Sequence, residues 1–209
     1  MQSSFFNSLF QFVTEEERFH REMVPAKREF EQVAGPIYDS DAGYAARINA
    51  FHNWYILDRP LSAKGRTPLE YFLEFNANSL PPDVLRGYQE LGQNLHSVFE
   101  LVKLGEKETW LRDLMTNRKF AVQGHEEMFY LDRGAVFNTR LFRHGGAYYP
   151  SNYLIVHPAE MLKRIKQEAR QVIRSKGDHK EFLFRLILFQ SRWDQYRQME
   201  VEKIYRFTT

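Results

Sequence analysis

The chain of 209 residues contains no cysteine. This absence excludes disulfide bonds, catalysis by a thiol and zinc sites built on thiolates. No apolar run approaches the ~20 residues that a helix needs to cross a bilayer, and the opening residues 1–6 lack the basic segment of a secretion signal. We therefore expect a soluble, cytoplasmic protein with no membrane insertion.

The chain also lacks the motifs of common enzyme classes, such as a glycine-rich phosphate loop or a nucleophile elbow. Glu17 and His20 have the Glu-x-x-His spacing of carboxylate-bridged di-iron proteins, but such sites need the motif twice and two further glutamates. The other His and Glu clusters, residues 125–127 and 157–160, fall in a strand connection and across a helix start. We therefore interpret Glu17 and His20 as surface residues. We predict no catalytic residue, no metal and no cofactor, and hence a protein that is not an enzyme.

His52 and Asp58 are the remaining candidates for a general acid-base pair. Their separation of six residues places them on no common helix face. Asp58 and Arg59 fit better as an ion pair or a cap at the end of a helix.

The stretch from residue 97 to 156 has the pattern of a small β-structure. Short apolar runs, some of them alternating with polar residues, are separated by turn signals such as Gly105, Gly134 and Gly145. The five runs span residues 97–104, 110–115, 120–122, 135–142 and 148–156. Five strands are too few for a two-sheet sandwich, and every connection is too short to hold the helix of a parallel crossover. We therefore predict a small, bent, antiparallel five-stranded β-barrel of the SH3 or OB kind.

Helical patterns flank this stretch on both sides. Thr67 and Glu70 form a capping box with Pro68 between them, which predicts a helix to about Asn76. Pro25 is expected to bend or end the first helix. The other predicted helices span residues 5–31 and 42–57, start near residue 82, and span residues 158–177 and 178–205. The predicted fold class is α+β, with an N-terminal helical region (1–96), a small β-barrel (97–156) and a C-terminal helical region (157–209) in one compact body.

Several segments resemble a family of poorly characterised bacterial proteins. These segments are FHNWYILD (51–58), GRTPLEYFL (65–73), HSVFEL (96–101), LRDL (111–114) and LDRG (131–134), followed by Arg140 and Leu141. The resemblance spans about residues 50–156 and rests on hydrophobic spacing and turn residues. Some members of that family carry a short Cys-rich zinc tail of the SecA C-terminal type. Because this chain has no cysteine, the resemblance implies no zinc-dependent partner contact here, and it implies no catalytic mechanism.

The charge is unevenly distributed along the chain. Residues 161–209 carry 12 Lys or Arg against 6 Asp or Glu, whereas residues 1–160 carry 17 against 21. A basic helical end is typical of a surface for nucleic acid or an acidic partner, and also of a solvated helix face.

We predict a non-enzymatic adaptor that binds another protein or a peptide through the barrel and its flanking helices. The alternative is a nucleic-acid-binding protein that uses the barrel aromatics and the basic C-terminal helices. The candidate binding residues are Tyr148, Tyr149, Tyr153, Arg140, Arg143 and Trp193. The barrel aromatics also fit the core of the barrel itself. The aromatic stripe of the last helix, which includes Trp193, would allow a homodimer if the rest of the chain does not cover it.

Overall fold

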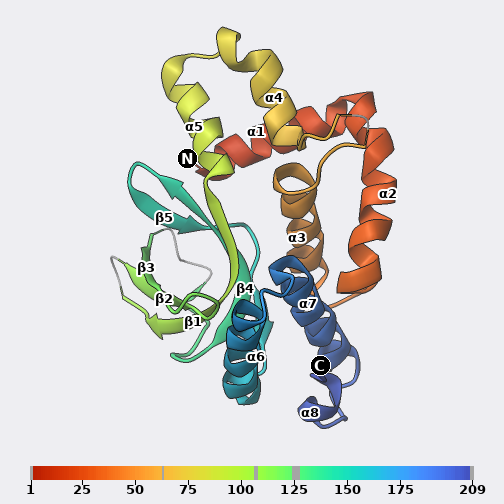
Figure 1. The fold of residues 1–209 in the computed structure, drawn as a ribbon, viewed down its shortest axis with the longest axis vertical. Helices are drawn as coiled ribbons and strands as arrows, with labels where there is room; N and C mark the ends of the chain where they lie inside the picture. The colour runs from red at the N-terminus through yellow and green to blue at the C-terminus, as the bar shows by residue number, and fades with distance from the viewer. Residues whose placement is uncertain (1, 63, 106–107, 124–127, 208–209) are drawn as a thin grey trace.

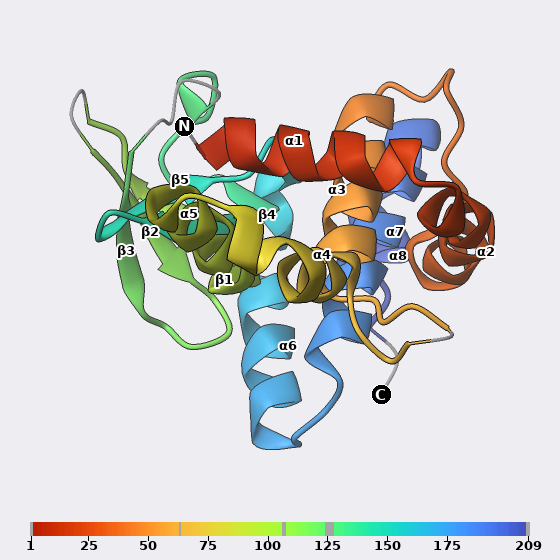
Figure 2. The same cartoon turned by 90° about the horizontal axis from the view of Figure 1, so that it is seen from above.

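The computed structural model describes residues 2–62, 64–105, 108–123 and 128–207, and it has the predicted α+β class. The helices are α1 (Gln2–Glu15), α2 (Glu17–Ala34), α3 (Tyr44–Leu57), α4 (Pro68–Asn76), α5 (Pro82–Gly92), α6 (Leu162–Arg174), α7 (His179–Gln195) and α8 (Val201–Ile204). The strands are β1 (Asn94–Lys103), β2 (Thr109–Asp113), β3 (Lys119–Val122), β4 (Val136–His144), β5 (Ala147–Pro150) and β6 (Ile155–His157). In Figure 1, α1, α4 and α5 lie at one end of the sheet, α3 and α7 lie beside it, and α2 packs against α3 and α7 on the side away from the sheet. Figure 2, seen from above, shows the strands on one side of the molecule and α2 on the opposite side.

The N-terminal helical region breaks earlier than the predicted position at Pro25. Glu16 has an extended backbone (φ −81°, ψ 113°) and separates α1 from α2, whereas Pro25 lies inside α2 on its exposed side. The break allows Phe12 and Phe19 to meet with ring centroids 5.6 Å apart on either side of the bend. Packing of these aromatic residues therefore accompanies the change of direction, and α2 continues through the proline.

The sheet corrects the predicted antiparallel five-stranded barrel in two respects. It has six strands in the order β1-β2-β3-β5-β4-β6, and an additional pairing of β1 with β4 closes five of them into a ring. It is also mixed, because β3 and β5 pair in parallel at Val122 and Tyr148. No crossover helix is needed for this pair, because β4 runs between β3 and β5 in the sequence and returns the chain to the same end of the ring.

The sixth strand arises because the last predicted strand, residues 148–156, divides into β5 and β6. β5 stays in the ring, and the chain then turns so that β6 pairs with the first half of β4. The hydroxyl of Thr139 on β4 donates to the carbonyl of Tyr153 at 2.7 Å, and the N–H of Ser151 donates to the carbonyl of Arg140 at 2.8 Å. These bonds hold the turn between β5 and β6 against β4.

Three apolar clusters form the interior. One fills the ring, a second joins α1–α5 to β4 and α7, and a third lies between the sheet and α6, α7 and α8. The capping box of α4 is confirmed, since Thr67 Oγ1 accepts from Glu70 N and Glu70 accepts from Thr67 N.

The last predicted helix, 178–205, is two helices in the structure. α7 ends at Gln195, and α8 turns back so that the ring of Tyr205 packs on Phe189 with centroids 5.3 Å apart. The apolar side of α7 is therefore largely covered by its own chain, including the buried Phe182 and Leu186. Within the part of the chain that the structure describes, no helix has the length and apolar character to span a membrane.

Candidate functional site

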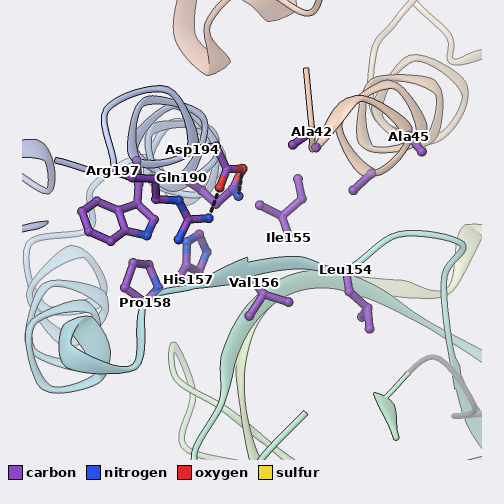
Figure 3. A pocket seen from close by; sticks show the side chains of 13 residues that line it. Ala42, Ala45, Leu154, Ile155, Val156, His157, Pro158, Gln190, Asp194 and Arg197 are labelled. Atoms are coloured by element: carbon purple, nitrogen blue, oxygen red, sulfur yellow. Dashed lines mark hydrogen bonds and ion pairs between the residues drawn. The ribbon is translucent and has the colours of Figure 1, made fainter. Parts of the chain in front are cut away.

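The start of α3, strand β6 and the end of α7 enclose a groove of about 510 Å³, which we call the β6 groove (Figure 3). Its lining residues are Ala42, Gly43, Ala45, Ala46, Leu154, Ile155, Val156, His157, Pro158, Gln190, Trp193, Asp194 and Arg197. The three walls come from segments more than 30 residues apart in the sequence, so the groove exists only in the folded chain.

Strand β6 is the floor of the groove and an edge strand of the sheet. It pairs with β4 along one edge, and no strand of the described residues pairs with its other edge. Five consecutive residues, 154–158, line the groove, so the backbone of the strand borders it as well as the side chains. An unpaired strand edge presents N–H and C=O groups to which another extended chain can pair.

His157 fixes β6 to the helices behind it through both nitrogens of its ring. Asn138 Nδ2 donates to the carbonyl of Leu183 at 2.9 Å, so the Oδ1 of Asn138 faces His157 Nε2 at 3.0 Å. Nε2 therefore carries the proton and donates, while Nδ1 accepts from the hydroxyl of Tyr205 at 3.0 Å. Burial lowers the pKa of His157 to about 3, because the charged ring would lose its hydration. The floor of the groove is thus held by a neutral histidine.

Arg47 fixes the α3 wall. Its guanidinium is buried and donates to the carbonyls of Ala34, Gly35 and Pro36 at the end of α2, and to Asp41 at 2.9 Å. A cation at these carbonyls satisfies groups that the helix end leaves without partners. Burial lowers the pKa of Arg47, and the charge of Asp41 opposes that effect. Arg47 thereby fixes the position of the segment that begins at Ala42 and lines the groove.

The α7 wall carries the aromatic and charged groups of the groove. Trp193 is half-buried, and the guanidinium carbon of Arg197 lies 5.1 Å from the centroid of its ring. Asp194 accepts hydrogen bonds from Gln190 and from Arg197. Figure 3 shows Gln190, Asp194 and Arg197 together on one side of the groove, opposite Ala42. These contacts hold the guanidinium of Arg197 and the ring of Trp193 at the open side of the groove, which we call its mouth.

A second hollow, of about 410 Å³, lies on the other side of β6. Val156 and His157 line both hollows, and Val156 is 37% exposed between them. The second hollow extends to Tyr130, whose side chain is 92% exposed.

Two of the six residues predicted to bind a partner lie in the interior. Arg140 is 1% exposed and Tyr153 is 2% exposed, so neither side chain reaches the surface. Arg140 forms a two-pronged ion pair with Asp58 and also donates to Asn94. The arginine thus joins the end of α3 to the sheet instead of facing a partner.

The remaining four predicted residues lie in two separate places. Tyr148 is half-buried and packs edge-on against Phe120 in the ring, and the Tyr149 hydroxyl donates to Gln123 at 3.0 Å. Arg143 is exposed across the strand pair from Tyr148. Trp193 alone among the six lies in the β6 groove.

The residues considered as candidates for catalysis or metal binding do not form a site. His52 packs on Phe10 with ring centroids 4.6 Å apart, and burial lowers its pKa to about 4, whereas Asp58 pairs with Arg140. Glu17 and His20 are both exposed, and Glu17 pairs with Arg21. Residues 125–127 lie outside the described residues. Within the described ranges, no group of three or more His, Asp or Glu side chains is placed to hold a metal ion.

Comparison of the chain with protein-family models, with curated proteins and with solved structures gave no match. The resemblance noted from the sequence therefore stays a prediction, and the function has to be argued from the groove itself. Sequence reasoning found Trp193 through the aromatic stripe of its helix. It missed Ala42, Gly43 and Gln190, because small or neutral residues give no chemical signal until the fold places them around a hollow.

Proposed function

We propose that this protein is an adaptor that binds an extended segment of another protein along the free edge of β6, in the β6 groove. The observation that supports the proposal is the position of an unpaired strand edge at the bottom of a groove with helical walls. Strand addition of this kind obtains affinity from main-chain hydrogen bonds and specificity from pockets for alternate side chains.

The two walls favour a particular peptide chemistry. The α3 wall consists of glycine and three alanines, which leave room for a side chain of the incoming peptide. Trp193 on the α7 wall offers an apolar face for that side chain. The groove therefore fits a peptide with an apolar side chain between the α3 wall and Trp193.

The charge at the mouth adds a second requirement. Arg197 is exposed, and its pairing with Asp194 uses one of its terminal nitrogens. A guanidinium has five N–H donors, so donors remain for a carboxylate of the partner. We expect the bound segment to carry an acidic residue, or its own C-terminal carboxylate, near Arg197.

Selection from a displayed library of random peptides tests this function. We expect enrichment of sequences with an apolar residue followed by an acidic one, and protection of the β6 amides against hydrogen exchange when such a peptide binds. Ala42→Trp fills the groove from an exposed position and should lower the affinity of the selected peptides at least about tenfold, or 1.4 kcal/mol.

Ala159→Trp is the matched control, because Ala159 is also an exposed alanine but lines the second hollow and not the β6 groove. It should leave the affinity unchanged. An equal loss in both variants, or a library that yields no enriched sequence, would contradict the proposal.

A further inference from the structure

The outward face of β1, β2 and β3 carries cations that do not line the β6 groove. Phe99, Leu111 and Phe120 point into the ring and are buried in its apolar cluster. Their neighbours on the strands therefore point outward. Glu100 pairs across the strands with Arg112, and Arg112 pairs with Lys119.

Helix α6 extends this face. The Nζ of Lys166 lies 3.8 Å from Glu100 Oε2, and Arg112 Nη1 lies 3.4 Å from the same oxygen. Lys163 and Arg170 are exposed; Lys163 precedes Lys166 by three residues and Arg170 follows it by four, so all three lie on one side of the helix. The surface thus combines the cations of two strands and one helix; we call it the β2–α6 face.

The acidic groups beside these cations balance them only in part. Glu100 is shared by two cations, and Glu108 is exposed just before β2. Asp113 is buried and accepts from Ser97, Thr116 and the N–H of Met115, so it does not face outward. Glu160 is also exposed and precedes Lys163 by three positions, so among the described residues the five cations outnumber three surface carboxylates.

An aromatic side chain lies among the cations. Trp110 follows the same alternation as Arg112, pairs across the strands with Ala121, and is half-buried on the outward side. The small side chain of Ala121 leaves the neighbouring position on β3 open.

We propose that the β2–α6 face binds single-stranded nucleic acid, with its phosphates on Arg112, Lys119, Lys163, Lys166 and Arg170 and a base stacked on Trp110. Unpaired bases have free faces that stack on an aromatic side chain, whereas bases in a duplex are already stacked on one another. A groove or surface of cations beside an aromatic platform is the arrangement by which proteins bind single strands with little sequence preference. This activity is independent of the β6 groove, so the failure of either proposal leaves the other intact.

Fluorescence anisotropy with a labelled single-stranded 12-mer tests the proposal on the full chain at several salt concentrations. Lys119→Gln, Lys163→Gln and Arg170→Gln together remove three exposed cations of the face. Each phosphate contact contributes about 0.7 to the slope of log K against log salt for a single strand, so the triple variant should lower that slope by about two. Trp110→Leu keeps an apolar side chain without an aromatic face and should weaken binding about tenfold.

The matched control is the triple variant Arg28→Gln, Lys64→Gln and Arg86→Gln. It removes the same net charge from exposed positions on α2, in the loop between α3 and α4, and on α5. We expect the control variant to bind the 12-mer with the affinity of the parent chain, because its charges lie elsewhere. Heparin is a polyanion without bases, so we expect Trp110→Leu to leave the affinity for heparin unchanged. Equal losses in both triple variants, affinity that is unchanged by Trp110→Leu, or no binding of the 12-mer at low salt would each overturn the proposal. A preference for poly-glutamate over the 12-mer would also overturn it, in favour of an acidic protein partner.

Discussion

Replacing Asp58 by alanine should destabilise the protein by about 3–5 kcal/mol, because it leaves a buried cation without its counter-ion. Arg140 is 1% exposed, and both of its terminal nitrogens donate to Asp58. Burial alone would lower the pKa of Arg140, but the charge and hydrogen bonds of Asp58 raise it, so the arginine stays charged. Asn94 and Tyr153, which also interact with the guanidinium, are neutral and cannot replace the charge of Asp58. Urea unfolding followed by circular dichroism measures the loss.

The exposed pair of Arg66 and Glu74 provides the control for this prediction. Glu74→Ala should cost less than about 1 kcal/mol, because solvent already screens that pair. The double variant Asp58→Leu with Arg140→Met should recover much of the loss, since it removes both charges. A cost for Asp58→Ala no greater than that for Glu74→Ala would show that the buried pair does not hold α3 to the sheet.

The second large effect is a loss of stability in mild acid. Burial lowers the pKa of His157 to about 3, and burial together with the charge of Arg140 lowers the pKa of His96 to about 3. A histidine in the unfolded chain has a pKa near 6.5, so below that pH the unfolded state binds protons that the folded state does not bind. The stability that these two residues provide is fully present above pH 6.5 and falls as the pH decreases toward 3. At pH 5 we expect a loss of about 2 kcal/mol for each of these two residues, and His52, whose pKa burial lowers to about 4, adds to that loss in the same direction.

Urea unfolding between pH 7.5 and pH 5 checks this expectation, because most carboxylates titrate below that range. The slope of the unfolding free energy against pH gives the number of protons taken up on unfolding, and His157→Gln should reduce that number by up to one. Tyr205→Phe removes the hydrogen bond to His157 without removing the titrating group, so it should lower stability by a similar amount at every pH. If His157→Gln keeps the pH dependence of the parent chain, His157 is not the neutral buried group that we describe.

Much of the secondary structure was predictable because its signals are local. Thr67, Pro68 and Glu70 are within four residues of one another, and they form the predicted cap in the structure. Asp178, at the predicted start of the last helix, caps α7 in the same local way by accepting from the N–H of Glu181 at 3.0 Å. Apolar alternation and glycine turns located the strands to within a few residues.

The candidate site was less predictable because its parts are distant in the sequence. Trp193 was identified from the aromatic stripe of its helix, yet Arg140 and Tyr153 proved to be interior residues. Nothing in the local sequence distinguishes a buried arginine that pairs with a half-buried aspartate 82 residues away from an arginine on the surface. The pairing of Arg140 with Asp58 forms only when the sheet packs against α3, and it gives Arg140 a place in the interior instead of the predicted role in binding a partner.

The sequence by itself determined the α+β class, the placing of the strands between two helical regions, and the absence of cysteine chemistry, because these follow from composition and from contacts a few residues apart. The tertiary structure decided the parallel pairing of β3 with β5, the departure of β6 from the ring, and the groove between α3 and α7. Each of these depends on which distant segments pack together, and the packing free energy is shared among many weak contacts that no single motif records.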